Sequence, residues 1–196
     1  MLSTDIDQII VPHSIDFYPQ RIDIDDYQQL GFSSADIADY WSVHGGGIAC
    51  LRMIIDGLAK RQDLPKTQSE WIHLAIKHEA YSGKNWIHRE LIAMAEQVAS
   101  VHGIARRNCT VVDLFHDLIK DRPCIASVTP QFQGKQEQRS GGHLVVVLGV
   151  EMVGNVVSRV LVHHPASLFI YDWAHKWIDV HAFEKSFSGS YMAFWE

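Results

Sequence analysis

A run of three glycines, Gly45–Gly47, leads directly into an apolar segment and is the first place in the chain where chemistry is expected. Ile48, Leu51, Ile55 and Leu58 recur at helical spacing, which predicts a helix with one apolar face. A buried helix that opens on glycines leaves its first backbone N–H groups unpaired, at the positive end of the helix dipole. Such a helix start suits an anion, or a nucleophile that must be kept ionised.

A histidine stands at the start of a later apolar run. His143 follows Gly142 and opens His143–Val150, a β-branched run typical of a strand buried on both faces. A general base must lie within about 3 Å of its nucleophile and must be oriented by a third group. The alternative is a histidine at a strand start that binds a loop carbonyl.

Cys50 lies one helical turn past Gly46 and therefore on nearly the same helix face, so its thiol must be weighed as a reactive group. A reactive thiol needs an exposed, electropositive setting, whereas a free cysteine is usually a small buried hydrophobe. Cys50 and Cys124 both lie in apolar runs. We therefore predict that both thiols are buried and inert.

Several histidines permit a metal site without requiring one. His163 and His164 are neighbours on an expected strand, so only one of them can face the cleft. His44, His143 and His164 would then offer three imidazoles to a zinc ion with one open position. Because nothing in the spacing demands a metal, we predict neither a metal nor a cofactor.

The composition favours an ordinary globular protein. The chain has 196 residues, is 47% hydrophobic and carries a formal charge of −6. One domain over residues 1–196 is expected, and the negative charge argues against nucleic acid as the main partner. The three widely spaced cysteines form neither a disulfide framework nor a zinc spacing, which favours a reducing, cytoplasmic compartment. No segment approaches the roughly 20 apolar residues of a membrane span, so no membrane partner is expected.

The order of the predicted elements defines the fold class. Capping signals and periodicity predict helices that begin near residues 35, 46, 68, 88 and 111, the fourth of them ending at Gly103. Strands are predicted near 9–12, 124–128, 143–150, 156–162 and 191–195, with a polar loop over 131–142. Helices come first and strands second, without βαβ alternation, which predicts an α+β fold. The helical lobe would cover about 31–122 and the antiparallel sheet lobe about 123–196.

The segment Gly47–Met53, Gly-Ile-Ala-Cys-Leu-Arg-Met, resembles the start of the active-site helix of papain-like cysteine peptidases. It is most similar to the branch that removes double-glycine leader peptides from bacteriocins. In that branch the helix opens Cys-Gly-(Pro/Ile)-Ala-Cys-Leu-x-Met and the first Cys is the nucleophile, so Gly46 stands at the nucleophile position here. Four further segments match in the family's order: Asn85–Leu91, Asp121–Ile125, Gly142-His143 and His164-Pro165. The resemblance runs from about Tyr40 to Trp195 and implies a papain-like fold.

The resemblance also implies roles for single residues. His143 matches the general base, and His164 takes the position of the Asp or Asn that orients it. Tyr40 takes the position of the oxyanion-hole glutamine, where it would either donate one hydrogen bond or be a packed aromatic. Trp41 matches a tryptophan that walls the site. With the glycine run and His44, these residues would form the ligand-binding cleft.

Three of the four catalytic positions are changed, at Tyr40, Gly46 and His164. We therefore predict a catalytically degenerate peptidase relative that binds a peptide or a small amide-type ligand without thiol hydrolysis. One alternative is altered chemistry, as a transferase, lyase or hydrolase with His143 as general base. Another is a pure protein-interaction module. A closed cleft filled by Tyr40 and Trp41 would favour the interaction module, and an open cleft with convergent His143, His164 and backbone donors would favour ligand binding or chemistry.

Two geometric expectations follow from the match. The His143 ring should face the start of the glycine-led helix, roughly 5–7 Å from the Gly46 Cα, if a cysteine side chain is to fit between them. The substitution Gly46→Cys should fit without a large loss of stability, provided that φ at this position is not positive.

Overall fold

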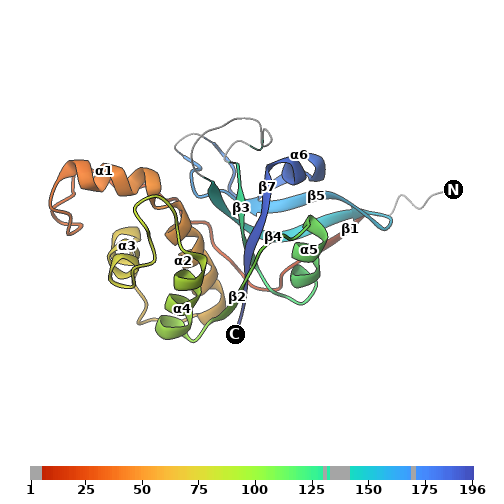
Figure 1. Cartoon of the computed structure of the whole chain (residues 1–196), viewed down its shortest axis with the longest axis horizontal. Helices are drawn as coiled ribbons and strands as arrows, with labels where there is room; N and C mark the ends of the chain where they lie inside the picture. Colours follow the sequence, from red (N-terminus) through yellow and green to blue (C-terminus); the bar gives the residue numbers. More distant parts are fainter. Residues whose placement is uncertain (1–5, 130–131, 133–141, 169–170) are drawn as a thin grey trace.

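The computed structural model describes residues 6–129, 132, 142–168 and 171–196 (Figure 1). Within these residues the helices are α1 Ala35–His44, α2 Gly46–Ala59, α3 Gln68–Lys77, α4 His88–Ala99, α5 Val111–Leu118 and α6 Val180–Ser186. The strands are β1 Ile6–Ile10, β2 His102–Arg106, β3 Cys124–Val128, β4 His143–Val153, β5 Val156–His163, β6 Lys176–Asp179 and β7 Phe187–Trp195. The predicted α+β class is confirmed.

Side-chain caps explain why three helices begin where the sequence predicts. The hydroxyl of Ser34 accepts a hydrogen bond from the backbone N–H of Ile37 at the start of α1. Thr67 and Glu70 form a capping box at the start of α3, and Thr110 and Asp113 form another at α5. Each cap satisfies N–H groups that the first helical turn leaves unpaired.

The predicted end of α4 is wrong. The helix ends at Ala99, and Ser100 takes the left-handed conformation with φ 57°. Gly103, expected to end the helix, lies instead in β2 opposite Phe194 of β7. A Cβ at position 103 would lie 3.0 Å from the Phe194 ring, so the glycine permits close strand packing.

The strands form one antiparallel sheet. Six of them follow the order β2-β7-β3-β4-β5-β6. The long strand β4 pairs with β3 through its first half, with β1 through its second half and with β5 along most of its length. The prediction that this strand is buried on both faces is confirmed from Leu144 to Glu151. Because β4 is central, its first residue has a fixed position in the fold.

Two C-terminal elements were not predicted from the sequence. Strand β6 is only four residues long and pairs with β5, and α6 follows it directly with Asp179 as N-cap. Both are too short and too polar to give a clear periodic pattern. The polar loop predicted over 131–142 lies almost entirely outside the described residues.

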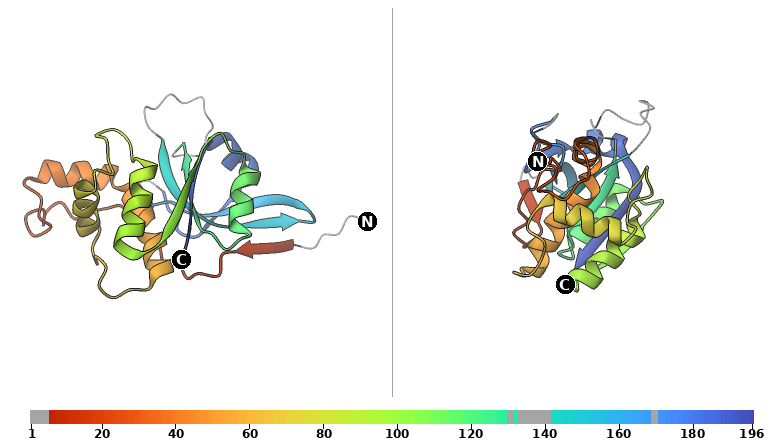
Figure 2. Two further views of the ribbon diagram at one scale, coloured as in Figure 1. Left: turned by 60° about the horizontal axis from the view of Figure 1, so that its bottom comes forward. Right: turned by 90° about the vertical axis from the view of Figure 1, so that its left-hand side faces the viewer.

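Helices α1–α4 gather at one end of the molecule, and the sheet with α5 and α6 forms the other end (Figure 1). The second view shows the same separation, with α1 farthest from β1 (Figure 2). Helix α2 lies between the two parts: Ile48, Leu51 and Ile55 are fully buried, and the helix packs against β4, α3 and α4. The predicted apolar face of α2 is therefore a central part of the core.

Candidate functional site

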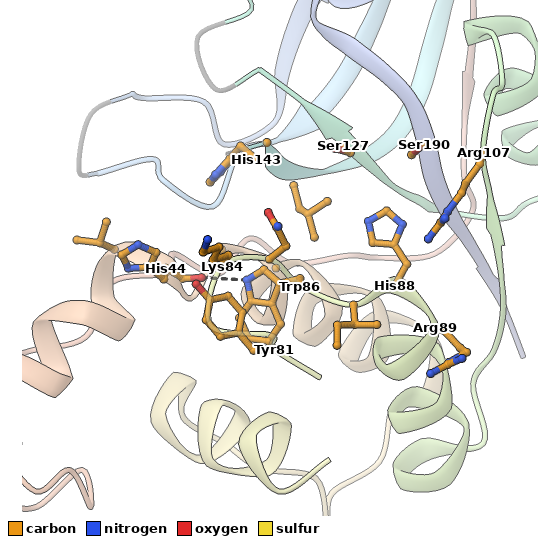
Figure 3. A pocket seen from close by; sticks show the side chains of 17 residues that line it. His44, Tyr81, Lys84, Trp86, His88, Arg89, Arg107, Ser127, His143 and Ser190 are labelled. Carbon is orange, nitrogen blue, oxygen red and sulfur yellow. Dashed lines mark hydrogen bonds between the residues drawn. The ribbon is translucent and has the colours of Figure 1, made fainter. Parts of the chain in front are cut away.

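A cavity of about 770 Å³ lies where the start of α2 meets the start of β4. Its wall includes Gly46 and Gly47 from α2 and His143 from β4 (Figure 3). The N-cap of α2 is Gly45, which offers no side-chain hydrogen bond to the first N–H groups of the helix. The positive end of a buried helix therefore borders an open space.

His143 faces Gly46, as expected, but lies closer than expected. A Cβ built on Gly46 would be 2.9 Å from His143 Cε1 and 2.8 Å from Gln20 Oε1. Since a Cα–Cβ bond is about 1.5 Å long, Cε1 lies within about 4.4 Å of the Gly46 Cα, which is shorter than the predicted distance of roughly 5–7 Å. The imidazole and the Gln20 amide thus occupy the space that a side chain at position 46 would need.

The relation between His143 and His164 differs from the expected one. The two rings stack with centroids 4.5 Å apart and an interplanar angle of 28°, and no hydrogen bond joins them. Nδ1 of His164 accepts a hydrogen bond from the backbone N–H of Ala166. Nε2 of His143 is enclosed and has no hydrogen-bond partner among the described residues. His164 therefore contacts the candidate base without orienting it as a carboxylate would.

Burial makes His143 a weak base. Desolvation, and then the nearby His164, lower the pKa of His143 from 6.5 to about 3. A lowered pKa means that the imidazole is neutral at physiological pH and has little tendency to take up a proton. The role of general base therefore stays a prediction, which the electrostatic setting does not favour.

Tyr40 does not reach the cavity. Its hydroxyl lies 3.0 Å from the Tyr81 hydroxyl and donates to the backbone oxygen of Gly83, and its ring stacks on His44. Position 40 lies on the exposed side of α1, and Tyr81 and Gly83 hold the phenol there. The expectation that Tyr40 supplies the oxyanion donor is therefore wrong, and the alternative of a packed aromatic fits.

Trp41 supports the wall without lining the cavity. It is buried and contacts Tyr81 and Trp86, which do line it. The Trp86 indole donates a hydrogen bond of 2.9 Å to the backbone oxygen of His44. A Cβ at Gly47 would overlap this indole, so position 47 must be glycine for the wall to pack.

The other predicted binding residues divide into two groups. His44, Gly46 and Gly47 line the cavity. Gly45 does not: its N–H donates to Trp41 O, and its own oxygen accepts from the Gln68 side chain. It is the residue that joins α1 to α2, as the C-cap of the first helix and the N-cap of the second.

Gln20 was not predicted from the sequence. It is 4% exposed, and its backbone N–H donates to Pro165 O, which fixes it beside the cleft. Its Nε2 donates to Val43 O and Ser42 O, and this orients the amide with Oε1 toward Gly46. Oε1 has no hydrogen-bond partner in the described part of the chain. No local pattern marks this residue, because a tertiary contact across the fold places it.

None of the three thiols lines the cavity, and all three are free. Cys50 is fully buried and its Sγ donates to Leu144 O at 3.3 Å. Burial raises the pKa of Cys50 and of Cys124 well above the usual value. The predicted burial of both residues is confirmed, and Cys50 has no setting that would make it a nucleophile.

The zinc alternative finds no support. No group of three His, Cys, Asp or Glu side chains converges to hold a metal ion in the ranges that the structure describes. His143 and His164 stack face to face, so their ring nitrogens do not point to a common centre.

No helix among the described residues is both long enough and apolar enough to cross a membrane.

Comparison with known proteins finds similarity at the level of structure. No family model and no curated protein sequence matches the chain. A crystal structure described as a C39-like peptidase from Bacillus anthracis aligns with a TM-score of 0.61 at 11% identity, covering 97% of this chain and 98% of that one. The chain has the C39-like, papain-like peptidase fold. A double glycine motif protease from an AMS/PCAT transporter, solved in complex with the leader peptide, aligns with a TM-score of 0.51 at 16% identity, covering 76% and 82%.

The C39-like fold explains the position of the cavity between the start of a buried helix and the start of a central strand. In the family that the sequence resembles, the nucleophilic cysteine stands at the helix start, and Gly46 occupies that position here. The parts that remain are the helix N-terminus, an uncharged histidine and an open space. These parts can bind a polar ligand, but they contain no nucleophile.

Proposed function

We propose that this protein is a catalytically degenerate relative of the C39-like peptidases, which binds a peptide or a small amide-type ligand in the cleft without thiol hydrolysis. The observation that carries this proposal is the setting of Gly46. The residue lines the cavity and faces His143, and atoms of Gln20 and His143 fill the place where a nucleophilic side chain would begin. The loss of the thiol is thus accompanied by packing that closes its site.

The open cavity supports ligand binding over a pure interaction module. A volume of about 770 Å³ is within the range of ligand sites, about 300–1,000 Å³. Tyr40 and Trp41, which would have filled a closed cleft, pack outside the cavity. The aromatic wall of Tyr81 and Trp86 offers a flat surface against which a peptide backbone can lie.

A peptide is the preferred ligand because of the fold. One structural neighbour was solved with a leader peptide bound. The start of α2 borders the cavity through Gly46 and Gly47 and supplies the backbone donors that a peptide carbonyl needs. Altered chemistry with His143 as base is less well supported, because the lowered pKa of His143 makes it a poor proton acceptor. A cytoplasmic location is part of the proposal and agrees with three free thiols.

Binding and hydrolysis are tested with the same probe. Acetylated and amidated pentapeptide pools are added to ¹⁵N-labelled protein, and the backbone signals of Gly46 and Gly47 and the Trp86 indole signal are followed by NMR. Mass spectrometry of the same samples reports cleavage. We expect shifts at these three residues and intact peptides.

A cavity-filling variant locates the binding. Ser127→Phe places a ring in the cavity wall and should weaken binding at least tenfold. The matched control Ser33→Phe adds the same ring at an exposed position before α1, outside the cavity, and should bind as the wild type does. Absence of binding by every pool would overturn the proposal. Cleavage that is lost in His143→Ala would overturn the degenerate assignment.

A further inference from the structure

The cavity wall is positively charged on a protein whose formal charge is −6. Lys84, Arg89 and Arg107 border the cavity, together with three histidines, and no acidic residue of the described chain does so. Cations that line a cavity without an acidic residue in its wall raise the local concentration of anions. The wall therefore selects by charge, in a direction opposite to the rest of the molecule.

Arg107 differs from most arginines of this protein because it has no carboxylate partner. Six others bind an Asp or Glu side chain: Arg52, Arg61, Arg89, Arg106, Arg122 and Arg159. Arg107 is exposed at the cavity wall and has neither an ion pair nor a side-chain hydrogen bond with any described residue. Its five N–H donors are therefore available to a ligand.

The surroundings of Arg107 offer further hydrogen-bonding groups beside its guanidinium. Figure 3 shows the Arg107 guanidinium beside the His88 ring, with Ser127 and Ser190 above them. Burial, and then the positive charge of Arg107, lower the pKa of His88, so the two groups lie within electrostatic range. The hydroxyls of Ser127 and Ser190 have no hydrogen-bond partner within the described ranges and can donate.

Arg89 provides the contrast. It borders the same cavity, but its guanidinium binds Glu90 at 2.6 Å and points away from His88 and Arg107 (Figure 3). Lys84 lies at the other end of the cavity, near His44, and has no carboxylate partner among the described residues. Two unpaired cations thus stand at opposite ends of one cavity.

We propose that Arg107, with Ser127, Ser190 and His88, forms a subsite for the carboxylate of an acidic peptide residue, and that Lys84 favours a second acid at the other end. This inference rests on the proposed peptide-binding function and names its substrate class. A guanidinium binds a carboxylate through two parallel hydrogen bonds, which fixes the orientation of the acidic residue as well as its charge. A glutamine has the same shape and lacks the charge, so it measures the electrostatic part alone.

The test uses three pools of acetylated, amidated pentapeptides with a fixed central Glu, Gln or Lys and mixed residues elsewhere. Dissociation constants are measured by NMR titration of the full chain in 50 mM salt. We expect the Glu pool to bind about tenfold more tightly than the Gln pool and the Lys pool to bind most weakly, as one charge-assisted pair predicts. The preference should shrink in 500 mM salt, where charges are screened beyond about 4 Å.

Two matched variants assign the subsite. Arg107→Gln should remove the preference for Glu over Gln, and because Arg107 has no partner in the described fold it should leave the free energy of unfolding unchanged. Arg89→Gln removes the same charge from the same cavity rim and should keep the preference, since its guanidinium already binds Glu90.

Three other results would contradict the acidic subsite or the peptide-binding function. Equal binding of the Glu and Gln pools would overturn the subsite and leave the proposed peptide binding intact. Failure of all three pools to bind would overturn the proposed function itself. If inorganic phosphate shifts the Arg107 side-chain signal and no Glu preference is seen, the site takes a small anion and the peptide assignment is wrong.

Discussion

Two buried polar groups lie against the same sheet, and they are satisfied to different degrees. Asp117 of α5 is 2% exposed and accepts hydrogen bonds from Arg106 at 2.8 Å, Arg122 at 3.3 Å and the Tyr191 hydroxyl at 2.8 Å. At the cleft, by contrast, Gln20 Oε1 and His143 Nε2 are enclosed without a partner among the described residues. A buried polar atom without a partner costs about 1–3 kcal/mol.

The Asp117 cluster contributes to the stability of the fold, whereas the polar atoms at the cleft do not. Burial alone would raise the pKa of Asp117, but the hydrogen bonds from Arg106 and Tyr191 and the charges of the arginines hold it below its usual range. The Asp117 carboxylate has hydrogen-bond partners on both oxygens, so it has no free acceptor site for a ligand. The cleft has donors without partners on its rim and two buried polar atoms without partners beneath it, so hydrogen bonds within the described fold do not account for these groups.

The largest loss of stability is expected from a substitution of Asp117, whose hydrogen bonds are all made. Asp117→Ala leaves two guanidinium groups and one hydroxyl without their shared acceptor and should lower the free energy of unfolding by about 3–4 kcal/mol. Urea denaturation measures this loss. The control Glu184→Ala removes an exposed carboxylate of α6 and should change stability by less than about 0.5 kcal/mol. A loss below about 1 kcal/mol in Asp117→Ala would remove the contrast between the two regions.

A side chain at position 46 tests how tightly Gln20 and His143 pack beside Gly46. The condition set for Gly46→Cys is met, since the backbone φ is not positive, but the new Cβ would lie within 3 Å of side-chain atoms of both Gln20 and His143, which must shift to admit it. The variant should lose about 1–3 kcal/mol of stability through overpacking. Adding Gln20→Ala should recover part of that loss, which a double-mutant cycle measures.

The same variant reports on chemistry. A thiol at the start of α2 should have a lowered pKa and react quickly with iodoacetamide at neutral pH. Peptide cleavage should stay weak, because Tyr40 lies outside the cavity and His164 stacks on His143 without orienting it. Efficient cleavage by Gly46→Cys would show that the closed packing does not prevent catalysis.

A smaller difference is expected between two hydroxyls. Tyr191→Phe removes hydrogen bonds to Asp117 and to Asp113 O and should cost about 1–2 kcal/mol in thermal or urea denaturation. Ser190→Ala removes a hydroxyl with no partner in the described structure and should cost less than about 0.5 kcal/mol. Equal costs would mean that the cleft hydroxyls already serve the fold.

The smallest expected signal is the absence of a titration. Because the pKa of His143 is lowered to about 3, its ring should stay neutral from pH 5 to 8, and its Cε1–H chemical shift should not move. A free histidine peptide titrates near 6.5 in the same range. The unfolded chain takes up this proton first, so His143 costs no stability above about pH 6.5 and lowers stability as the pH falls toward 3. A midpoint near 6.5 in the folded protein would place the ring in water.

Local patterns predicted the elements that stand around the cleft. The glycine run, the spacing of Ile48 and Leu51 and the β-branched run after His143 each reflect local rules of helix and strand formation, and α2 and β4 were predicted from them. Strand β2 was missed because Gly103 reads as a helix terminator unless its partner Phe194 is known.

The contents of the cleft were less predictable than its walls. Gln20 reaches Gly46 from more than 20 residues upstream and is fixed by Pro165, a contact that no local spacing reveals. Tyr40 was assigned to the position of the family's oxyanion-hole glutamine, but on α1 its side chain packs against Tyr81 and His44, outside the cavity. Side-chain direction depends on how α1 packs, and a single sequence does not contain that information.

The anchoring of the N-terminal segment has a consequence for synthesis on the ribosome. Ile6 of β1 pairs with Val153 of β4, and the Gln20 N–H binds Pro165 O. The partners of this segment are made about 145 residues after it, and at roughly 5–20 residues per second this delay lasts about 7 to 30 seconds. Ile15 and Ile22, which end in the core, must wait through this interval without their partners. The segment from Ile6 to Ile22 is therefore made long before it can dock, and Gln20 takes its place beside the cleft only after Pro165 has been translated.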